Sequence, residues 1–278
     1  MTQMSAAQAN ATDNDEMLVD RSDGVLTLTF NRPAYRNALT PFMLNTLRTE
    51  LANAELDPDI GCIVLTGAGS AFCAGGDVKA MAASHNSDAP VNHTVRMEQQ
   101  RSSHRATSLR LYEMSKPTLA SLPGAAAGAG FSLALACDMR IAARNAIMTS
   151  AFAKVGLSGD YGGTYLLTQL VGTAKARELY LLADKIDMDE ALRLGIVNWV
   201  VSADELAAKT RELAVRLANG PGVAQRLIKD NLNRALKATF AECLDTESAN
   251  MAEARRTDDH IEAAKAFAEK RTPHFKGR

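Results

Sequence analysis

The sequence predicts an α/β fold that is followed by an entirely helical C-terminal region. Three observations support this prediction. Short apolar segments alternate with amphipathic ones in the first half of the chain, two of these segments run into loops of glycine and alanine, and helical patterns dominate after Gly163. The 278 residues suit one large domain or two smaller ones. We expect a disordered tail over residues 1–16, a core over 17–200 and a helical region over 201–278.

The first predicted elements are a strand over residues 24–30, where apolar and polar residues alternate, and a helix over residues 41–57. Asn31-Arg32-Pro33 ends the strand. Thr40 is suited to cap the helix, and Pro41 is suited to its first turn. Apolar residues then recur at helical spacing, which predicts one buried helix face. These residues are Leu44, Leu47, Leu51 and Ala54.

Two later segments share one plan, in which a buried strand leads through a loop of small residues into a helix. In the first, a strand over residues 62–66 is followed by glycine and alanine, and a helix begins near Asp77. In the second, a strand that begins at Thr118 is followed by a glycine-rich turn and a helix that ends near Ala136. The first N–H groups of a helix have no acceptor within it. Two such loops can therefore present N–H groups to one oxyanion, and this predicts an enzyme.

The remaining elements follow from similar patterns and from breaks at glycine and proline. We expect a surface segment over 82–93, a helix over 94–115, short strands over 138–143, 147–150 and 198–201, a loop over 152–163, and helices that continue to about residue 271.

Composition excludes several classes of function. The formal net charge of −1 gives no overall field that favours nucleic acid or an anionic membrane. No apolar run approaches the ~20 residues that span a bilayer, and the polar N-terminus has no apolar signal segment, so we expect a cytoplasmic protein. The four cysteines lack metal-like spacing, and we expect no metal site. The dinucleotide-binding fingerprint, the phosphate-binding P-loop and the serine-hydrolase elbow are all missing from the sequence.

Several motifs lie at residues 31–33, 37–39, 71–79, 122–138, 162–164, 170–172, 174–176 and 195–197. Taken together, they resemble the crotonase, or enoyl-CoA hydratase/isomerase, family, and the resemblance covers about residues 17–278. It implies a spiral of ββα units and a helical C-terminal region that forms trimers, which pair into hexamers. It also implies acyl-CoA thioester substrates and no separate cofactor, because coenzyme A is part of the substrate.

The resemblance assigns the oxyanion-binding N–H groups to Gly76 and Ala129. A fixed donor of this kind is worth about 3–4 kcal/mol in the transition state. Glycine is usual in the family at the position of Ala129, and a positive φ there would strain alanine. The implied coenzyme A and substrate contacts are Arg36, Ala38, Leu39, Ala74, Asp77, Val78, Lys79 and Phe152, with Phe267 and Lys270 contributed by a neighbouring subunit.

The position of Asp160 favours an isomerase. Family hydratases use two glutamates to activate water, and Ser132 and Phe152 occupy the matching positions here. Asp160 matches the position of a catalytic aspartate in several family isomerases, where a single base suits a 1,3-proton shift. Ser132 and Tyr161 could assist by hydrogen bonding, and among the histidines His104 could reach the pocket. The alternatives are hydration, hydrolysis or dehalogenation through a nucleophilic Asp160, and a non-catalytic CoA-ester binder.

Overall fold

The computed structural model describes residues 16–77 and 92–277, and its strands form two sheets. The six-stranded sheet has the order β1-β2-β3-β5-β7-β10, and the four-stranded sheet has the order β4-β6-β8-β9. The larger sheet consists of β1 (Met17–Ser22), β2 (Val25–Phe30), β3 (Cys62–Gly67), β5 (Thr118–Leu122), β7 (Met139–Ala143) and β10 (Trp199–Val201). The smaller sheet consists of β4 (Ala71–Cys73), β6 (Ala125–Ala127), β8 (Ile147–Thr149) and β9 (Ile186–Asp187).

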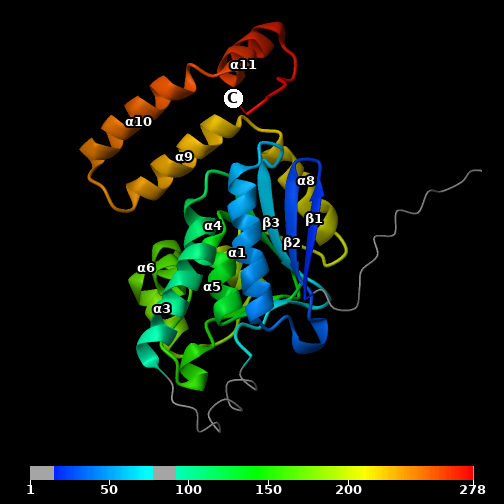
Figure 1. Cartoon of the computed structure of the whole chain (residues 1–278), viewed down its shortest axis with the longest axis vertical. Helices are drawn as coiled ribbons and strands as arrows, with labels where there is room; N and C mark the ends of the chain where they lie inside the picture. Colours follow the sequence, from blue (N-terminus) through cyan, green and yellow to red (C-terminus); the bar gives the residue numbers. More distant parts are fainter. Residues whose placement is uncertain (1–15, 78–91, 278) are drawn as a thin grey trace, which may run out of the picture.

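Helices connect the strands and make up the C-terminal part of the chain (Figure 1). The first half contains η1 (Pro33–Tyr35), α1 (Pro41–Leu56), α3 (His93–His104), the π-helical turn η2 (Arg105–Leu109), α4 (Arg110–Glu113), α5 (Ala129–Ala136) and the 3₁₀ turn η3 (Phe152–Val155). The second half contains α6 (Gly163–Leu181), α7 (Met188–Arg193), α8 (Leu206–Ala218), α9 (Gly222–Ala235), α10 (Phe240–Ala254) and α11 (Asp258–Glu269).

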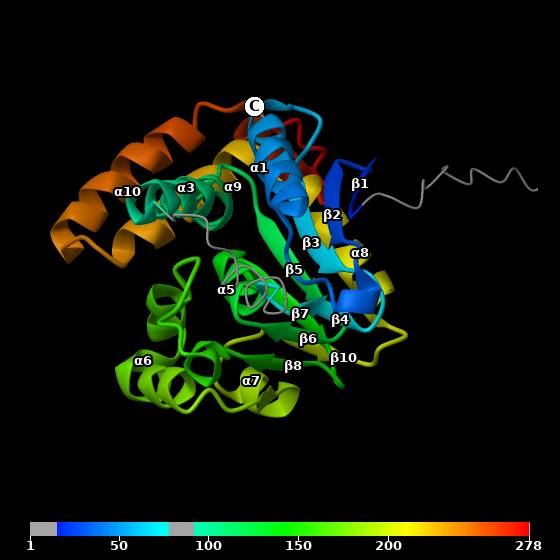
Figure 2. The same ribbon diagram turned by 60° about the horizontal axis from the view of Figure 1, so that its bottom comes forward.

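The two sheets arise from a repeated unit of two strands and a helix. The pairs β3–β4, β5–β6 and β7–β8 are followed along the chain by α3, α5 and α6. The first strands of these units pair in parallel with one another in the large sheet, and the second strands pair in parallel in the small sheet. Each unit therefore adds its first strand to the large sheet and its second strand to the small sheet, as Figure 2 shows. This arrangement confirms the predicted α/β spiral of ββα units.

The core lies on both faces of the large sheet. On one face, α1 and α5 pack over the strands, and the buried rings of Phe30 and Phe72 meet edge to face with 5.7 Å between their centroids. On the other face, α8 covers the strands through Leu206 and Ala214. Because both faces are covered, β3 and β5 are apolar along most of their length, and this pattern made them predictable.

The predicted helix over residues 41–57 is confirmed, with its last residue at Leu56. Thr40 caps it as expected, since its Oγ1 accepts a hydrogen bond from the Met43 N–H. Met43 occupies the buried face, while Leu44 is only partly buried and lines the cavity described below.

The edge strand β1 was missed by the sequence prediction. Its exposed Asp20 and Arg21 break the alternation that marks a half-buried strand. The missed signal is Asp23-Gly24, where both residues have positive φ and join β1 to β2 in a hairpin. The three-residue strands β4 and β6 were also missed, because both are short and β6 contains only alanine, which has low strand propensity.

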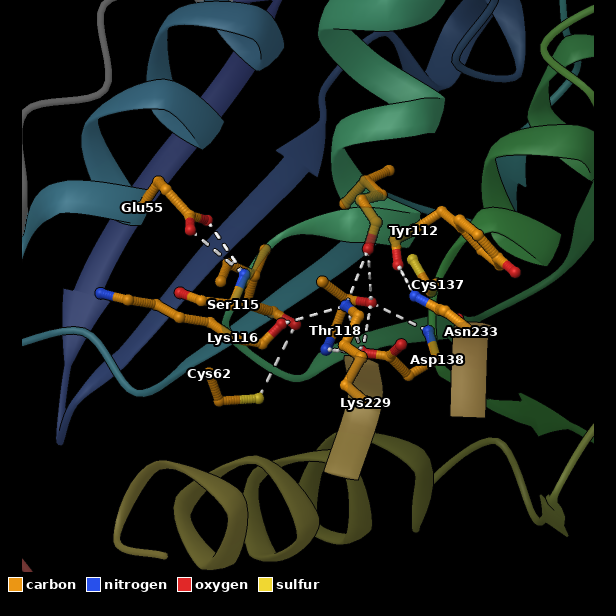
Figure 3. A network of polar contacts seen from close by, with 12 residues as sticks. Glu55, Cys62, Tyr112, Ser115, Lys116, Thr118, Cys137, Asp138, Lys229 and Asn233 are labelled. Carbon is orange, nitrogen blue, oxygen red and sulfur yellow. Dashed lines mark hydrogen bonds and ion pairs between the residues drawn. The ribbon is translucent and has the colours of Figure 1, made fainter. Parts of the chain in front are cut away.

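The helices α9–α11 extend away from the sheets (Figure 1). A buried polar network, drawn in Figure 3, attaches α9 to the core. Lys229 Nζ lies 2.9 Å from Asp138 Oδ2 and donates to the carbonyl oxygen of Leu111 at 3.1 Å, while Asp138 Oδ2 also accepts from the Thr118 N–H. The Asn233 side chain donates to the carbonyl oxygen of Tyr112. This network holds α9 in place although most of the C-terminal region is exposed.

The predicted domain boundary after residue 200 stays a prediction, and α8, just beyond it, covers the large sheet. The predicted tail, except for Glu16, and most of the predicted surface segment over 82–93 lie outside the described residues. No described helix has both the length and the apolar character needed to cross a membrane.

Candidate active site

A cavity of about 400 Å³ lies between the two small-residue loops and the segment that follows β8. Its walls come from the start of α1, the segment after β4, the N-terminus of α5, and the loop that contains η3. Predicted site residues make up much of its lining. These are Leu39, Ala74, Gly76, Asp77, Ala129, Phe152 and Asp160.

The backbones of the two loops meet at Gly75. This residue has a φ of +87°, and a Cβ atom placed on it would lie 2.7 Å from the carbonyl oxygen of Ala127 and 3.0 Å from the amide nitrogen of Ala129. The same loop is held from its other side, since the Leu39 N–H donates to the carbonyl oxygen of Gly75 at 2.8 Å. Only glycine fits this contact, and Gly76 is thereby placed beside the start of α5.

Ala129 is the first residue of α5, and its N–H belongs to the turn that has no acceptor within the helix. The preceding residue, Gly128, has a φ of +53° and donates its own N–H to the carbonyl oxygen of Thr149. The positive φ values therefore fall on Gly75 and Gly128. The strain considered for Ala129 does not arise, because this residue has helical geometry.

Asn37 holds the first of these loops in place. Its side chain is fully buried, and Nδ2 lies within hydrogen-bond distance of the carbonyl oxygens of Ala68, Ala71 and Phe72. Its Oδ1 accepts from the Arg32 N–H at 2.9 Å. Asn37 has a φ of +57°, which asparagine tolerates better than most residues. The sequence prediction treated it only as part of a motif and missed this structural role.

Asp160 lies in the loop between η3 and α6. Its Oδ1 accepts from the Tyr161 N–H at 3.0 Å and from Gln100 Nε2 at 3.3 Å, and it lies 2.5 Å from His104 Nε2. Asp160 and Tyr161 also line a second, polar cavity of about 570 Å³. The carboxylate therefore lies between an apolar cavity that Gly76 and Ala129, the predicted oxyanion donors, help to line and a polar cavity beside α3.

The two positions that lack the family glutamates are occupied by residues of different character. Phe152 is 6% exposed, and its ring stacks against that of Tyr180 with an interplanar angle of 4°. Ser132 is fully buried, and its Oγ donates to the carbonyl oxygen of Gly128 at 3.3 Å. Burial raises the pKa of Tyr180 to about 12, so its hydroxyl is protonated at neutral pH.

Tyr161 forms part of the wall beside Asp160. Its ring is 6% exposed and lies 4.3 Å from the ring of His104, measured between centroids. Burial, and then the negative charge of Asp160, raise the pKa of the Tyr161 phenol well above its ordinary value. Its hydroxyl is therefore a neutral group at physiological pH.

Some predicted contacts do not line the cavity of this chain. Arg36 is exposed and contributes a backbone carbonyl that accepts from the Ala74 N–H, while the carbonyl oxygen of Ala38 accepts from the Arg32 side chain. Phe267 and Lys270 lie in and just after α11, and neither lines the cavity. Their predicted role depends on a neighbouring subunit and stays a prediction. The predicted contacts Val78 and Lys79 lie outside the described residues.

Comparisons with known proteins identify the family of this chain. The family model described as "Enoyl-CoA hydratase/isomerase" matches residues 20–278. The chain is 38% identical to the 1,2-epoxyphenylacetyl-CoA isomerase of Escherichia coli K12, over 92% of this chain and 96% of that protein. It is 36% identical to a Mycobacterium bovis protein named "Probable enoyl-CoA hydratase", over 94% of this chain and 98% of that protein.

A solved structure also shares the fold over nearly the whole chain. The enoyl-CoA hydratase of Polaromonas sp. JS666 superposes with a TM-score of 0.86 at 34% identity, and the match covers 93% of this chain and 99% of that one. The family match, the relatives and the structural likeness all extend over the ββα spiral and the C-terminal helices. The chain therefore belongs to the enoyl-CoA hydratase/isomerase family.

Proposed function

We propose that this protein is an enoyl-CoA isomerase, which moves a carbon–carbon double bond in an acyl-CoA thioester with Asp160 as the base. The N–H groups of Gly76 and Ala129 bind the thioester oxygen. Removal of a proton from the carbon next to a thioester places negative charge on that oxygen. Donors that are fixed before the reaction stabilise this charge without reorganisation, and each contributes about 3–4 kcal/mol.

The observation that carries the proposal is the position of Asp160. This carboxylate lines the same cavity as Gly76 and Ala129. Among the described lining residues, the other carboxylate is Asp77, which lies 3.8 Å from the Arg32 guanidinium. A carboxylate that is not paired with a guanidinium, beside a proposed oxyanion site, suits the removal of a proton from one carbon and its return to another.

The proton transfers follow from this arrangement. Asp160 removes a proton from C2 of a 3-enoyl thioester, and the electrons of the C–H bond form a dienolate whose oxygen is held by the two N–H groups. The proton then returns to C4, and a conjugated 2-enoyl thioester results. No water is added, so the mass of the substrate does not change. Leu44, Phe152, Val155 and Leu157 give the cavity an apolar wall, which suits an apolar acyl chain.

Hydration is the second candidate, since enoyl-CoA hydratase is the printed name of several relatives. It requires an acid and a base around one water molecule. Ser132 and Phe152 supply no carboxylate at the family positions, which is why we favour isomerisation. Two alternatives remain. A nucleophilic Asp160 would form a mixed anhydride and displace the CoA thiolate in hydrolysis, or form an ester and displace halide in dehalogenation. The other alternative is a CoA-ester binder without turnover.

The test uses 2-enoyl- and 3-enoyl-CoA esters and follows product mass and enoyl-thioester absorbance together. We expect unchanged mass with a shifted double bond. Asp160→Asn should lower kcat by about 10²–10⁴-fold and leave thioester binding intact. The matched control is Asp189→Asn, because Asp189 is 79% exposed and its partner is the surface residue Arg144.

Each alternative gives a different result in this assay. A gain of one water in the product would establish hydration. A covalent adduct on Asp160 would establish the nucleophilic route, and tight binding without turnover would establish a binder. Isomerisation by Asp160→Asn at nearly the wild-type rate would contradict the assignment of the base.

Assembly into trimers or hexamers belongs to the same proposal. Large apolar side chains are exposed on the C-terminal helices, including Leu232, Phe240 and Phe267, the last of which is 87% exposed. In such an assembly, Phe267 and Lys270 would approach the coenzyme A of a neighbouring subunit. Sedimentation analysis should give three or six chains per particle, and a monomer would contradict this part of the proposal.

A further inference from the structure

We propose that the acyl chain of the substrate ends in a carboxylate, and that Arg105 and Lys237 bind this carboxylate. The inference rests on the proposed function, since it takes the thioester oxygen to lie at the N–H groups of Gly76 and Ala129. It adds the chemistry of the far end of the acyl chain. Arg105 and Lys237 take no part in the proton transfers and determine specificity.

The site for the carboxylate is a small cavity of about 220 Å³, which we call the cationic cavity. Its walls come from the end of α3, from η2 and α4, from the start of α6 and from the turn after α9. The residues that give it cations and hydroxyl groups are Arg105, Lys237, His104, Ser108, Tyr112 and Tyr165. None of the described residues that line it is an aspartate or a glutamate. The described lining therefore favours an anion.

The two cations are available to a ligand. In the part of the chain that the structure describes, neither Arg105 nor Lys237 has a carboxylate partner, and both side chains are exposed. The Lys237 ammonium lies 5.9 Å from the centroid of the Tyr112 ring. By contrast, Arg101, one turn before Arg105, is paired with Glu98 at 2.6 Å. A guanidinium beside an ammonium suits a carboxylate, because the guanidinium can bind both carboxylate oxygens.

Two phenol groups add hydrogen-bond donors to the lining. Tyr112 Oη is buried and has no aligned hydrogen-bond partner among the described residues. Burial, and then the neighbouring Tyr165, raise the pKa of the Tyr112 phenol to about 12, so it is protonated at neutral pH. In such a pair, one hydroxyl group can donate to the other, and the proton of the second remains for a ligand oxygen.

Shared residues connect the cationic cavity to the proposed site of chemistry. The apolar and polar cavities share Asp160 and Tyr161, and the polar and cationic cavities share His104, Arg105, Tyr161 and Gly162. In the proposed reaction Asp160 lies beside C2 and C4 of the substrate. The chain beyond C4 therefore begins where the apolar and polar cavities adjoin. A chain that continues through the polar cavity brings its end to Arg105.

The charges along this path favour a carboxylate over a methyl group at the end of the chain. An apolar end would displace water from the guanidinium of Arg105 and give it no partner, which costs free energy. A carboxylate pairs with it instead. Asp160 repels a second carboxylate, but among the described residues it lines the apolar and polar cavities and does not line the cationic one. The terminal carboxylate is therefore placed beyond Asp160, next to the two cations.

The test measures equilibrium binding of saturated CoA thioesters, so that no double bond can move during the measurement. Pimeloyl-CoA and heptanoyl-CoA have chains of equal length, which end in a carboxylate and a methyl group respectively. Arg105→Gln should weaken binding of pimeloyl-CoA on the order of fivefold, as expected for an ion pair that solvent still screens, and should leave heptanoyl-CoA unchanged. Azelaoyl-CoA and nonanoyl-CoA repeat the comparison with a longer chain.

Further variants separate the cavity from the overall charge of the protein. Lys237→Gln should weaken pimeloyl-CoA selectively, as Arg105→Gln does. Arg105→Lys should keep part of the selectivity, because lysine retains the charge but not the two-pronged geometry. Arg96→Gln is the matched control, since Arg96 is exposed on α3 and lines none of the three cavities. It removes the same charge from the same helix and should change neither affinity.

The outcomes separate this inference from the proposed function. For both chain lengths, equal loss of the two esters in Arg105→Gln, no loss of either, or the same selective loss in Arg96→Gln would overturn the carboxylate site while isomerisation stands. Binding of free pimelate that depends on Arg105, without selective loss of the dicarboxylate thioesters, would indicate a separate anion site and would also overturn it. Selective loss in a protein that moves no double bond would support the carboxylate site and overturn the isomerase. A wild-type protein that binds no thioester would overturn both.

Discussion

Gly75→Ala should lower activity strongly, because Gly75 is the point at which the two small-residue loops, which carry the proposed oxyanion donors, meet. The new Cβ would lie 2.7 Å from the carbonyl oxygen of Ala127 and 3.0 Å from the amide nitrogen of Ala129. Both atoms belong to the backbone, so no flexible side chain can move aside. The loop must therefore shift and carry the N–H of Gly76 with it.

The losses of stability and activity in Gly75→Ala follow from two costs, the strain of a positive φ on alanine and the displacement of the Gly76 N–H. A left-handed backbone costs a residue with a Cβ about 1–2 kcal/mol, which lowers stability. A misplacement of about 1 Å at a catalytic group costs on the order of 10²-fold in rate, and loss of one oxyanion donor costs about 10²–10³-fold. We therefore expect Gly75→Ala to lose about 1–2 kcal/mol of stability, or somewhat more, and about 10²–10³-fold in kcat.

Gly195→Ala is the control for backbone strain. Gly195 has a φ of +72°, similar to the +87° of Gly75, and a Cβ there would meet no atom within 4 Å. Thermal unfolding should show a decrease of ~2–8 °C in Tm for this variant, with kcat unchanged. A kcat of Gly75→Ala within about threefold of wild type would refute the role of the Gly75 contact with α5 in placing Gly76. A displaced N–H donor should lower kcat far more than about threefold.

Two further predictions concern stability. Lys229→Met should lower the free energy of unfolding, measured by urea titration, by about 2–3 kcal/mol. This is less than for a fully buried ion pair, because the partner Asp138 is 25% exposed. Lys209→Met removes one partner of an exposed ion pair and should lower the free energy of unfolding by less than ~1 kcal/mol. Burial raises the pKa of the Cys62, Cys73 and Cys137 thiols from 9.0 to about 12. As the pH rises above 9, these thiols therefore lose their protons in the unfolded chain before they do so in the folded protein. The free energy of unfolding should then fall between pH 9 and 12 by up to about 1.4 kcal/mol per pH unit per thiol. Thiolate absorbance that rises near pH 9 in folded Cys243→Ser, whose remaining thiols are Cys62, Cys73 and Cys137, would contradict the second prediction.

Much of the fold could be predicted from local patterns. The apolar run of β3 and the cap formed by Thr40 depend on neighbours in the sequence, and both are confirmed. The edge strand β1 was missed although its hairpin turn is a local signal, because its exposed Asp20 and Arg21 break the alternation. The three-residue strands β4 and β6 could not be recognised from local patterns, since each pairs in parallel with strands elsewhere in the chain.

The candidate site was predictable where its chemistry depends on residue type. The two small-residue loops, the missing glutamates at Ser132 and Phe152, and the aspartate at position 160 are all visible in the sequence. The helical geometry of Ala129 was not visible, because it depends on Gly128 taking the positive φ. The support that Asn37 gives to the first loop was also hidden, since its acceptors lie about thirty residues further along the chain.

The sequence by itself determined which elements form and which chemical groups the site can contain. Apolar periodicity, helix caps and glycine positions are local properties, and they act before distant parts of the chain meet. Only the tertiary structure decided that Gly75 touches the start of α5 and that His104 approaches Asp160. Both contacts join residues that are far apart in the chain and are brought together by parallel pairing of successive ββα units, which no local pattern encodes.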